Sequence, residues 1–139
     1  MCWKLLLAIA TLAACQGGPA GIDDVVGGTL HWTGSVGGIG GWQHTPASAG
    51  YTVRLELDND GSVSAFRNDS LVATSHISMR EPAARYGSAD DYDVTFDPPL
   101  HVFPFATMET STVRTPEAGT IVFADPCCDM YSHTFETQP

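Results

Sequence analysis

Alternation of apolar and polar residues at every second position is the feature that most constrains how this chain folds. The clearest run extends from residue 51 to 58, where the apolar side chains are Tyr51, Val53, Leu55 and Leu57. Because successive side chains of a β-strand point to opposite faces of a sheet, this run predicts a strand with one buried face. Helical periodicity is absent after residue 14, apart from a short candidate at 81–86. The folded part of the chain is therefore expected to be all-β.

Turn signals separate the alternating runs. Asp58-Asn59-Asp60-Gly61 and Asn68-Asp69-Ser70 contain the Gly and Asx residues that tolerate a positive φ. The predicted strands are 29–35, 51–57, 62–67, 71–80, 92–96, 108–114, 120–124 and 131–137. In the run 71–80, Leu71, Ala73, Ile77 and Met79 are expected to share one face. Asp97-Pro98-Pro99 is expected to interrupt the pattern, since proline lacks the ladder donor. About eight strands in simple succession predict an antiparallel up-and-down meander, and closure into a barrel would remove its open edges.

The first residues have the layout of a secretory signal. Met1 to Lys4 is a short segment with one basic side chain, and an apolar run from Leu5 to Ala14 follows it. This run is about half of the roughly 20 residues that a membrane-spanning helix needs. Its end, Leu12-Ala13-Ala14-Cys15, matches the bacterial lipobox, in which the cysteine receives diacylglycerol and becomes the new N-terminus. We expect a lipoprotein signal peptide at 1–14, a flexible lipid-anchored tether at 15–27 and a barrel domain at 28–139; the alternative is an ordinary signal peptide with an incidental cysteine.

The charge balance argues against electrostatic partners. The chain has 16 acidic and 6 basic residues and a net charge of −10, and Lys4 is its sole lysine. Binding to nucleic acid, or to anionic lipid headgroups, requires clustered Lys and Arg. Membrane attachment is therefore expected to come from acyl chains such as palmitate on Cys15, which bury enough hydrocarbon to anchor a protein when two or more are present.

Two segments together resemble a known family. They are residues 32–41, which begin Trp32-Thr33-Gly34-Ser35, and residues 125–135, which contain Asp125-Pro126-Cys127-Cys128 and run into the last predicted strand. The chain resembles small lipocalin-like lipoproteins of Bacteroidetes-type bacteria. The resemblance implies an eight-stranded barrel with an internal ligand site. Unlike lipocalins, this chain has no arginine on its last strand to cover Trp32. By the same kind of resemblance to lipoprotein sorting, Gln16 after the cysteine favours the outer membrane of a bacterial cell envelope.

Adjacent cysteines at 127 and 128 leave several chemistries open. Their Cα atoms are about 3.8 Å apart across a trans peptide, which is short for a disulfide. The options are a strained vicinal disulfide, two thiols of which one faces the core, or a soft-metal site that includes His133. Structural roles are favoured, because a metal site needs three or four ligands at recognisable spacing. The histidines are scattered one to a segment, and no nucleophile motif is present. We therefore expect no enzymatic activity and no cofactor.

Three functional hypotheses follow. In the first, the protein is a monomeric lipid-anchored binding module whose small apolar cavity is lined by Trp32, Tyr51, Val53, Leu55, Leu57 and Phe96. In the second, those side chains fill the barrel, and the protein is a structural or interaction lipoprotein without a ligand. The third and weakest is a thiol or metal function at Cys127 and Cys128.

Overall fold

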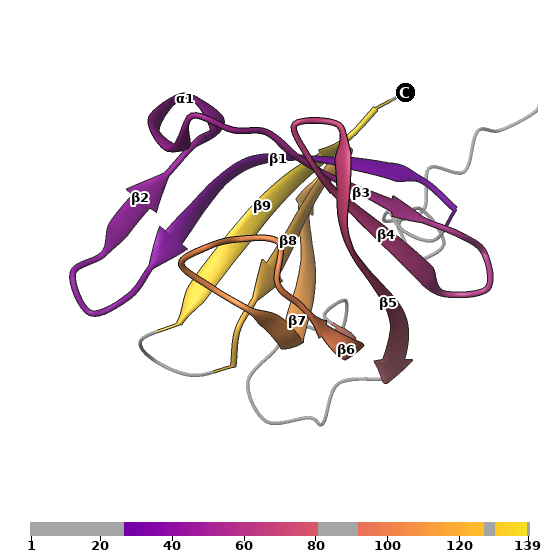
Figure 1. Ribbon diagram of the computed structural model, residues 1–139. Helices are drawn as coiled ribbons and strands as arrows, with labels where there is room; N and C mark the ends of the chain where they lie inside the picture. The colour runs from indigo at the N-terminus through magenta and orange to yellow at the C-terminus, as the bar shows by residue number, and fades with distance from the viewer. Residues whose placement is uncertain (1–26, 81–91, 127–129, 139) are drawn as a thin grey trace, which may run out of the picture.

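The strands form a closed barrel. The computed structural model describes residues 27–80, 92–126 and 130–138. The elements are β1 (Thr29–Gly37), β2 (Trp42–His44), α1 (Pro46–Ala49), β3 (Val53–Leu57), β4 (Ser62–Arg67), β5 (Ser70–Arg80), β6 (Tyr92–Leu100), β7 (Met108–Glu117), β8 (Thr120–Ala124) and β9 (Tyr131–Thr137). Strands β3 to β9 follow one another as antiparallel neighbours, and β1 pairs with both β3 and β9 (Figure 1). The predicted all-β, eight-stranded antiparallel barrel is confirmed, with one strand added to it.

The additional strand is β2, which the sequence did not predict. It pairs with the last residues of β1, Ser35 to Gly37, whereas the first residues of β1 pair with β3. The turn between β1 and β2 contains Gly38 and Gly41, both with positive φ. Gly37 permits the close approach of β9, since a Cβ at Gly37 would lie 2.3 Å from the carbonyl oxygen of Met130. The β1–β2 hairpin and α1 thus form an extension beside the closed barrel (Figure 1).

Helix α1 was also missed, although its capping signal is present in the sequence. Thr45 is the N-cap, Pro46 occupies the first turn, and the backbone N–H of Ser48 donates to Thr45 Oγ1 at 3.2 Å. Gly50 ends the helix in the left-handed conformation, with a φ of 76°. The predicted helical candidate at 81–86 lies outside the described residues.

Strand β6 continues where proline was expected to end it. It runs through Pro98 and Pro99 to Leu100, but its ladder to β7 is interrupted between Thr95 and Leu100. Pro98 and Pro99 therefore lie where β6 makes no backbone hydrogen bonds to β7, so their missing N–H groups leave no acceptor on β7 unpaired. The hydroxyl of Ser75 on β5 donates to the Pro98 carbonyl oxygen at 2.7 Å. The expected interruption at 97–99 is therefore present in the ladder to β7, but it does not end the strand.

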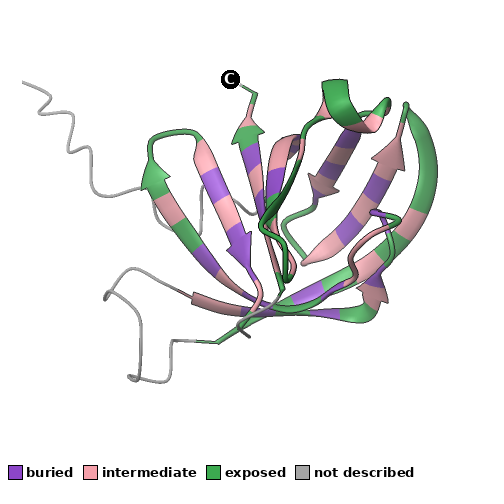
Figure 2. Cartoon of the chain, turned by 90° about the vertical axis from the view of Figure 1, so that its left-hand side faces the viewer, coloured by how far each residue is buried: buried purple, intermediate pink, exposed green. Residues whose placement is uncertain are grey.

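The barrel interior is filled by side chains. Burial alternates along the strands, as Figure 2 shows by colour, and the inward side chains form one apolar cluster. Among them, Leu30, Leu55, Ala65, Phe123 and Phe135 have no measurable exposure. The predicted inward face of β5 holds for Ala73 and Ile77 but is wrong for Leu71, which is 57% exposed, and Met79 near the end of the strand is 40% exposed rather than buried. Ala65 and Phe66 of β4 pair with Ala73 and Leu71, so Val72 is an extra residue in β5, and this bulge turns Leu71 outward.

Candidate ligand site at one end of the barrel

The predicted cavity residues lie in the core. Trp32, Val53, Leu55, Leu57 and Phe96 are each at most 3% exposed and belong to the apolar cluster. Tyr51 is partly buried and stacks on Trp32, with ring centroids 5.7 Å apart. The structure brings these six residues together, but as packing partners of one another and of the surrounding core. None of them lines the pocket described below.

A loop after β6 closes one end of the barrel. Phe103 of this loop is only 4% exposed, and its ring lies 5.1 Å from that of Trp32 and parallel to that of His133 at 4.5 Å. Arg67 at the end of β4 holds the loop by donating from both Nε and Nη2 to the Val102 carbonyl oxygen. The Arg67 guanidinium also lies over the Tyr51 ring. Tyr51 thus covers Trp32, with Arg67 on the Tyr51 ring, and the last strand supplies no arginine for this purpose.

A chain of hydrogen bonds runs through the core beneath this loop. The indole N–H of Trp32 donates to Ser35 Oγ at 2.9 Å, and Ser35 Oγ is hydrogen-bonded to His133 Nδ1 at 2.7 Å. Because Ser35 accepts from Trp32, its own hydroxyl can donate to Nδ1, which leaves the ring proton of neutral His133 on Nε2. Nε2 is buried and has no partner among the described residues. Burial lowers the pKa of His133 from 6.5 to about 4, so the ring is neutral at pH 7.

Stability is expected to depend on this histidine. Since the folded pKa lies below the unfolded value of 6.5, the unfolded chain binds more protons between pH 6.5 and about 4. The free energy of unfolding therefore has its full value above pH 6.5. It decreases by about 3 kcal/mol in total as the pH falls from 6.5 towards 4. Urea unfolding at several pH values should show this decrease in wild type and not in His133→Leu. Equal slopes for the two proteins would contradict the assignment.

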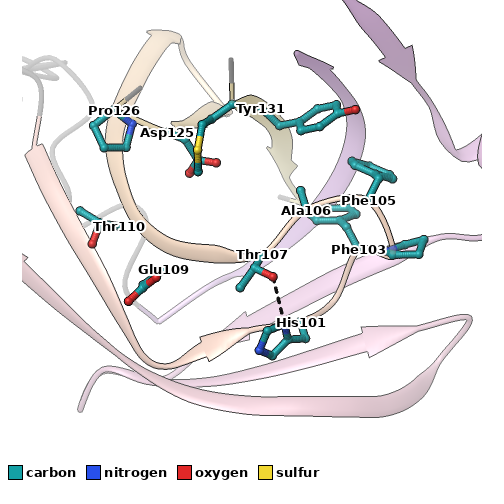
Figure 3. Close-up of a pocket in the computed structure, with 12 residues that line it drawn as sticks. His101, Phe103, Phe105, Ala106, Thr107, Glu109, Thr110, Asp125, Pro126 and Tyr131 are labelled. Atoms are coloured by element: carbon teal, nitrogen blue, oxygen red, sulfur yellow. Dashed lines mark hydrogen bonds between the residues drawn. The ribbon is translucent and has the colours of Figure 1, made fainter. Parts of the chain in front are cut away.

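A pocket opens beside the closing loop, and we name it the end pocket. Its volume is about 690 Å³, within the range of small-molecule sites. It is lined by the loop after β6, the start of β7, the two residues that follow β8 and the start of β9 with the residue before it (Figure 3). The lining residues are His101, Phe103, Pro104, Phe105, Ala106, Thr107, Glu109, Thr110, Asp125, Pro126, Met130 and Tyr131. A smaller pocket of about 310 Å³ lies at the opposite end of the barrel, beside the β7–β8 turn.

One wall of the end pocket is aromatic. Phe105 stacks on His44 of β2 at 4.0 Å and contacts Tyr131 of β9 at 4.9 Å, so the extension beside the barrel supports this wall. Phe103 forms its base, with its ring 5.3 Å from that of Phe105. Aromatic stacking between the loop and two strands fixes the ring positions before any ligand arrives.

The facing wall is polar and acidic. Asp125 accepts a hydrogen bond from Ser111 Oγ at 3.1 Å, and burial raises the pKa of its carboxyl above the ordinary value. Glu109 lines the same wall. At the base, His101 Nδ1 and Thr107 Oγ1 are hydrogen-bonded at 3.0 Å. The end pocket can therefore offer an apolar surface and carboxylate acceptors to the same ligand.

The other predicted site residues are the cysteines and His133. Cys15, Cys127 and Cys128 lie outside the described residues, and His133 is enclosed by the core. Within the described ranges, no group of three His, Cys, Asp or Glu side chains lies close enough to hold a metal ion. In the same ranges, no helix is long and apolar enough to cross a bilayer.

Sequence reasoning missed the end pocket, although it marked both segments that form it. The interruption predicted at Asp97-Pro98-Pro99 runs into the loop that carries Phe103 and Phe105, and Asp125 to Tyr131 belongs to the segment that carries the family resemblance. An aromatic–proline–aromatic loop at a barrel end was the available signal. No known protein family, curated protein or solved structure matches this chain.

Proposed function

We propose that this protein is a lipid-anchored, monomeric binding protein of the bacterial cell envelope, attached through Cys15 to the outer membrane, that takes up a small ligand with an apolar body in the end pocket. The lipobox at 12–15 supports the anchor. The single observation that carries the binding function is a pocket of about 690 Å³ with a preformed aromatic wall. The proposal retains the small hydrophobic ligand inferred from sequence but moves it from the barrel axis to the barrel end.

The position of the end pocket fits this proposal. In an up-and-down barrel the connections alternate between the two ends, so the loops after β6 and β8 share an end with the β1–β2 hairpin. Gly27, the first described residue, lies at the other end, next to Gln138. A flexible tether from Cys15 would therefore join the barrel at the end opposite the pocket, with a reach of about 20 Å. The ligand would enter from water rather than from the bilayer that holds the anchor.

Native mass spectrometry of the protein extracted from cell membranes tests the binding function. Wild type is expected to carry a small-molecule mass in addition to the acyl chains. Ala106→Trp, which fills the end pocket, should lose that mass. Val72→Trp adds the same bulk at a position on β5 that is 44% exposed, and should retain it. Bare wild-type protein, or equal loading of Ala106→Trp, would contradict the proposal.

A second candidate function is supported by a different surface. The barrel interior is solid, and the β1–β2 hairpin exposes Ile39 (92%) and Trp42 (66%). No Asp, Glu, Lys or Arg occurs between Asp24 and Arg54. An uncharged, partly apolar hairpin on an acidic protein suits contact with another envelope protein. Bare wild type in the mass spectrometric experiment would favour this structural or interaction role.

A further inference from the structure

We infer that the end pocket selects ligands that carry a positive charge beside an apolar body, such as aryl or alkyl amines and quaternary ammonium compounds. This inference rests on the proposed function and specifies its ligand class. It follows from three properties of the pocket: its charge, the incomplete pairing of a half-buried carboxylate, and the placement of aromatic rings opposite that carboxylate.

The first property is the sign of the charge. Among the described residues that line the pocket, Glu109 and Asp125 carry carboxyl groups and none is Lys or Arg. The nearby Arg67 is engaged with the Val102 carbonyl oxygen and the Tyr51 ring on the other side of the loop. The whole chain has a net charge of −10 and adds an attractive field for cations. A fatty-acid carboxylate or a phosphate would meet repulsion from both carboxylates.

The second property concerns Asp125, which is short of hydrogen-bond donors. Its side chain accepts from Ser111 Oγ, and the backbone N–H of Tyr131 also favours its ionised form. Within the part of the chain that the structure describes, no salt bridge reaches Asp125 or Glu109. A carboxylate has about four acceptor sites, so most of those on Asp125 remain for a ligand. Because burial destabilises this ionised carboxylate, a cation that enters the pocket restores the interaction that water would otherwise supply.

The third property is the arrangement of the two walls. Figure 3 shows the rings of Phe103 and Phe105 on one side of the opening and Glu109 and Thr110 on the other. The Phe105 ring already stacks on His44, so this wall offers an apolar surface to the body of the ligand, and the attraction for its positive charge comes from the facing carboxylates. A ligand with a ring and an adjacent ammonium group can contact both walls at once.

Three probes that share an aromatic ring and differ in charge test this inference with the full chain in lipid nanodiscs. They are benzyltrimethylammonium, benzyl alcohol and benzoate, and binding is measured by saturation-transfer NMR with empty nanodiscs subtracted. The cation is expected to bind about tenfold more tightly than the alcohol, and benzoate more weakly than either. The preference for the cation should decrease as the salt concentration rises, because the pocket is open to solvent.

A double substitution identifies the carboxylates responsible. Glu109→Gln/Asp125→Asn should bind the cation and the alcohol equally well. The matched control, Glu117→Gln/Glu136→Gln, removes the same net charge outside the end pocket and should keep the tenfold preference. A preference that survives the first double substitution, or that disappears in the control, would overturn the assignment to Glu109 and Asp125.

The outcomes also separate this inference from the proposed function. If benzyl alcohol binds wild type but not Ala106→Trp, and the cation binds no more tightly than the alcohol, the end pocket is a ligand site and the cation preference is wrong. If none of the three probes binds wild type, both the ligand class and the binding function are wrong.

Discussion

Cys15→Ser protein is expected to incorporate no labelled palmitate, whereas wild type incorporates it into a chain that begins at residue 15. Each buried methylene contributes about 0.8 kcal/mol, so two or three acyl chains hold a protein on a bilayer and their loss abolishes the attachment. The measurement combines metabolic labelling with the intact mass of the processed protein. Cys2→Ser is the matched control, because Cys2 lies in the predicted signal peptide, and its labelling should equal that of wild type.

Two results would contradict the anchor. One is palmitate incorporation in Cys15→Ser, which would place the acyl chain on another residue. The other is a wild-type chain whose processed N-terminus lies anywhere but Cys15, as expected for an ordinary signal peptide.

Phe135→Ala is expected to destabilise the barrel by about 3–5 kcal/mol. The Phe135 side chain is completely buried on β9, meets the Phe123 ring edge-on at 5.6 Å and lies near Phe103 of the closing loop. Removing the ring from a solid interior leaves a cavity that neighbours on opposite strands cannot close. This loss is a large part of the 5–15 kcal/mol that stabilises a typical domain. Urea unfolding monitored by circular dichroism measures it.

The control for this substitution is Glu136→Ala on the same strand. Its side chain is exposed, so the expected change in unfolding free energy is within about 0.5 kcal/mol. A hollow barrel would respond differently, because a ring that faces an open cavity has fewer neighbours to lose. A cost below about 1.5 kcal/mol for Phe135→Ala would contradict the solid interior.

Sequence patterning predicted the barrel because burial in a strand is a local property with a period of two. The ranges 120–124 and 131–137 match β8 and β9, and the hairpin of β3 and β4 follows the alternation from residue 51. Leu71 shows the limit of this reasoning: Val72 is an extra, unpaired residue within β5 that reverses the alternation, and the residue types of β5 do not reveal it. The short elements β2 and α1 were missed because three or four residues carry too little periodicity.

The candidate site was less predictable, for a physical reason. Alternation indicates which side chains point inward but not how completely they fill the interior, so Trp32 and Phe96 were expected to line a cavity that the structure fills with packed side chains. The end pocket is formed by two segments far apart in sequence, represented by Phe105 and Asp125. Their proximity depends on barrel closure and on the path of a loop, neither of which has a local signature.

The position of a bound ligand on the barrel is the most direct test of the end pocket as the ligand site. Full-length protein with labelled Ala, Leu and Met methyl groups is titrated with benzyl alcohol in nanodiscs and observed by NMR. The methyl resonances of Ala106 and Met130, which line the end pocket, should shift, while those of Ala65 and Leu55, buried in the core, should not. Shifts at Ala65 and Leu55 without shifts at Ala106 and Met130 would place the ligand inside the barrel and contradict the account.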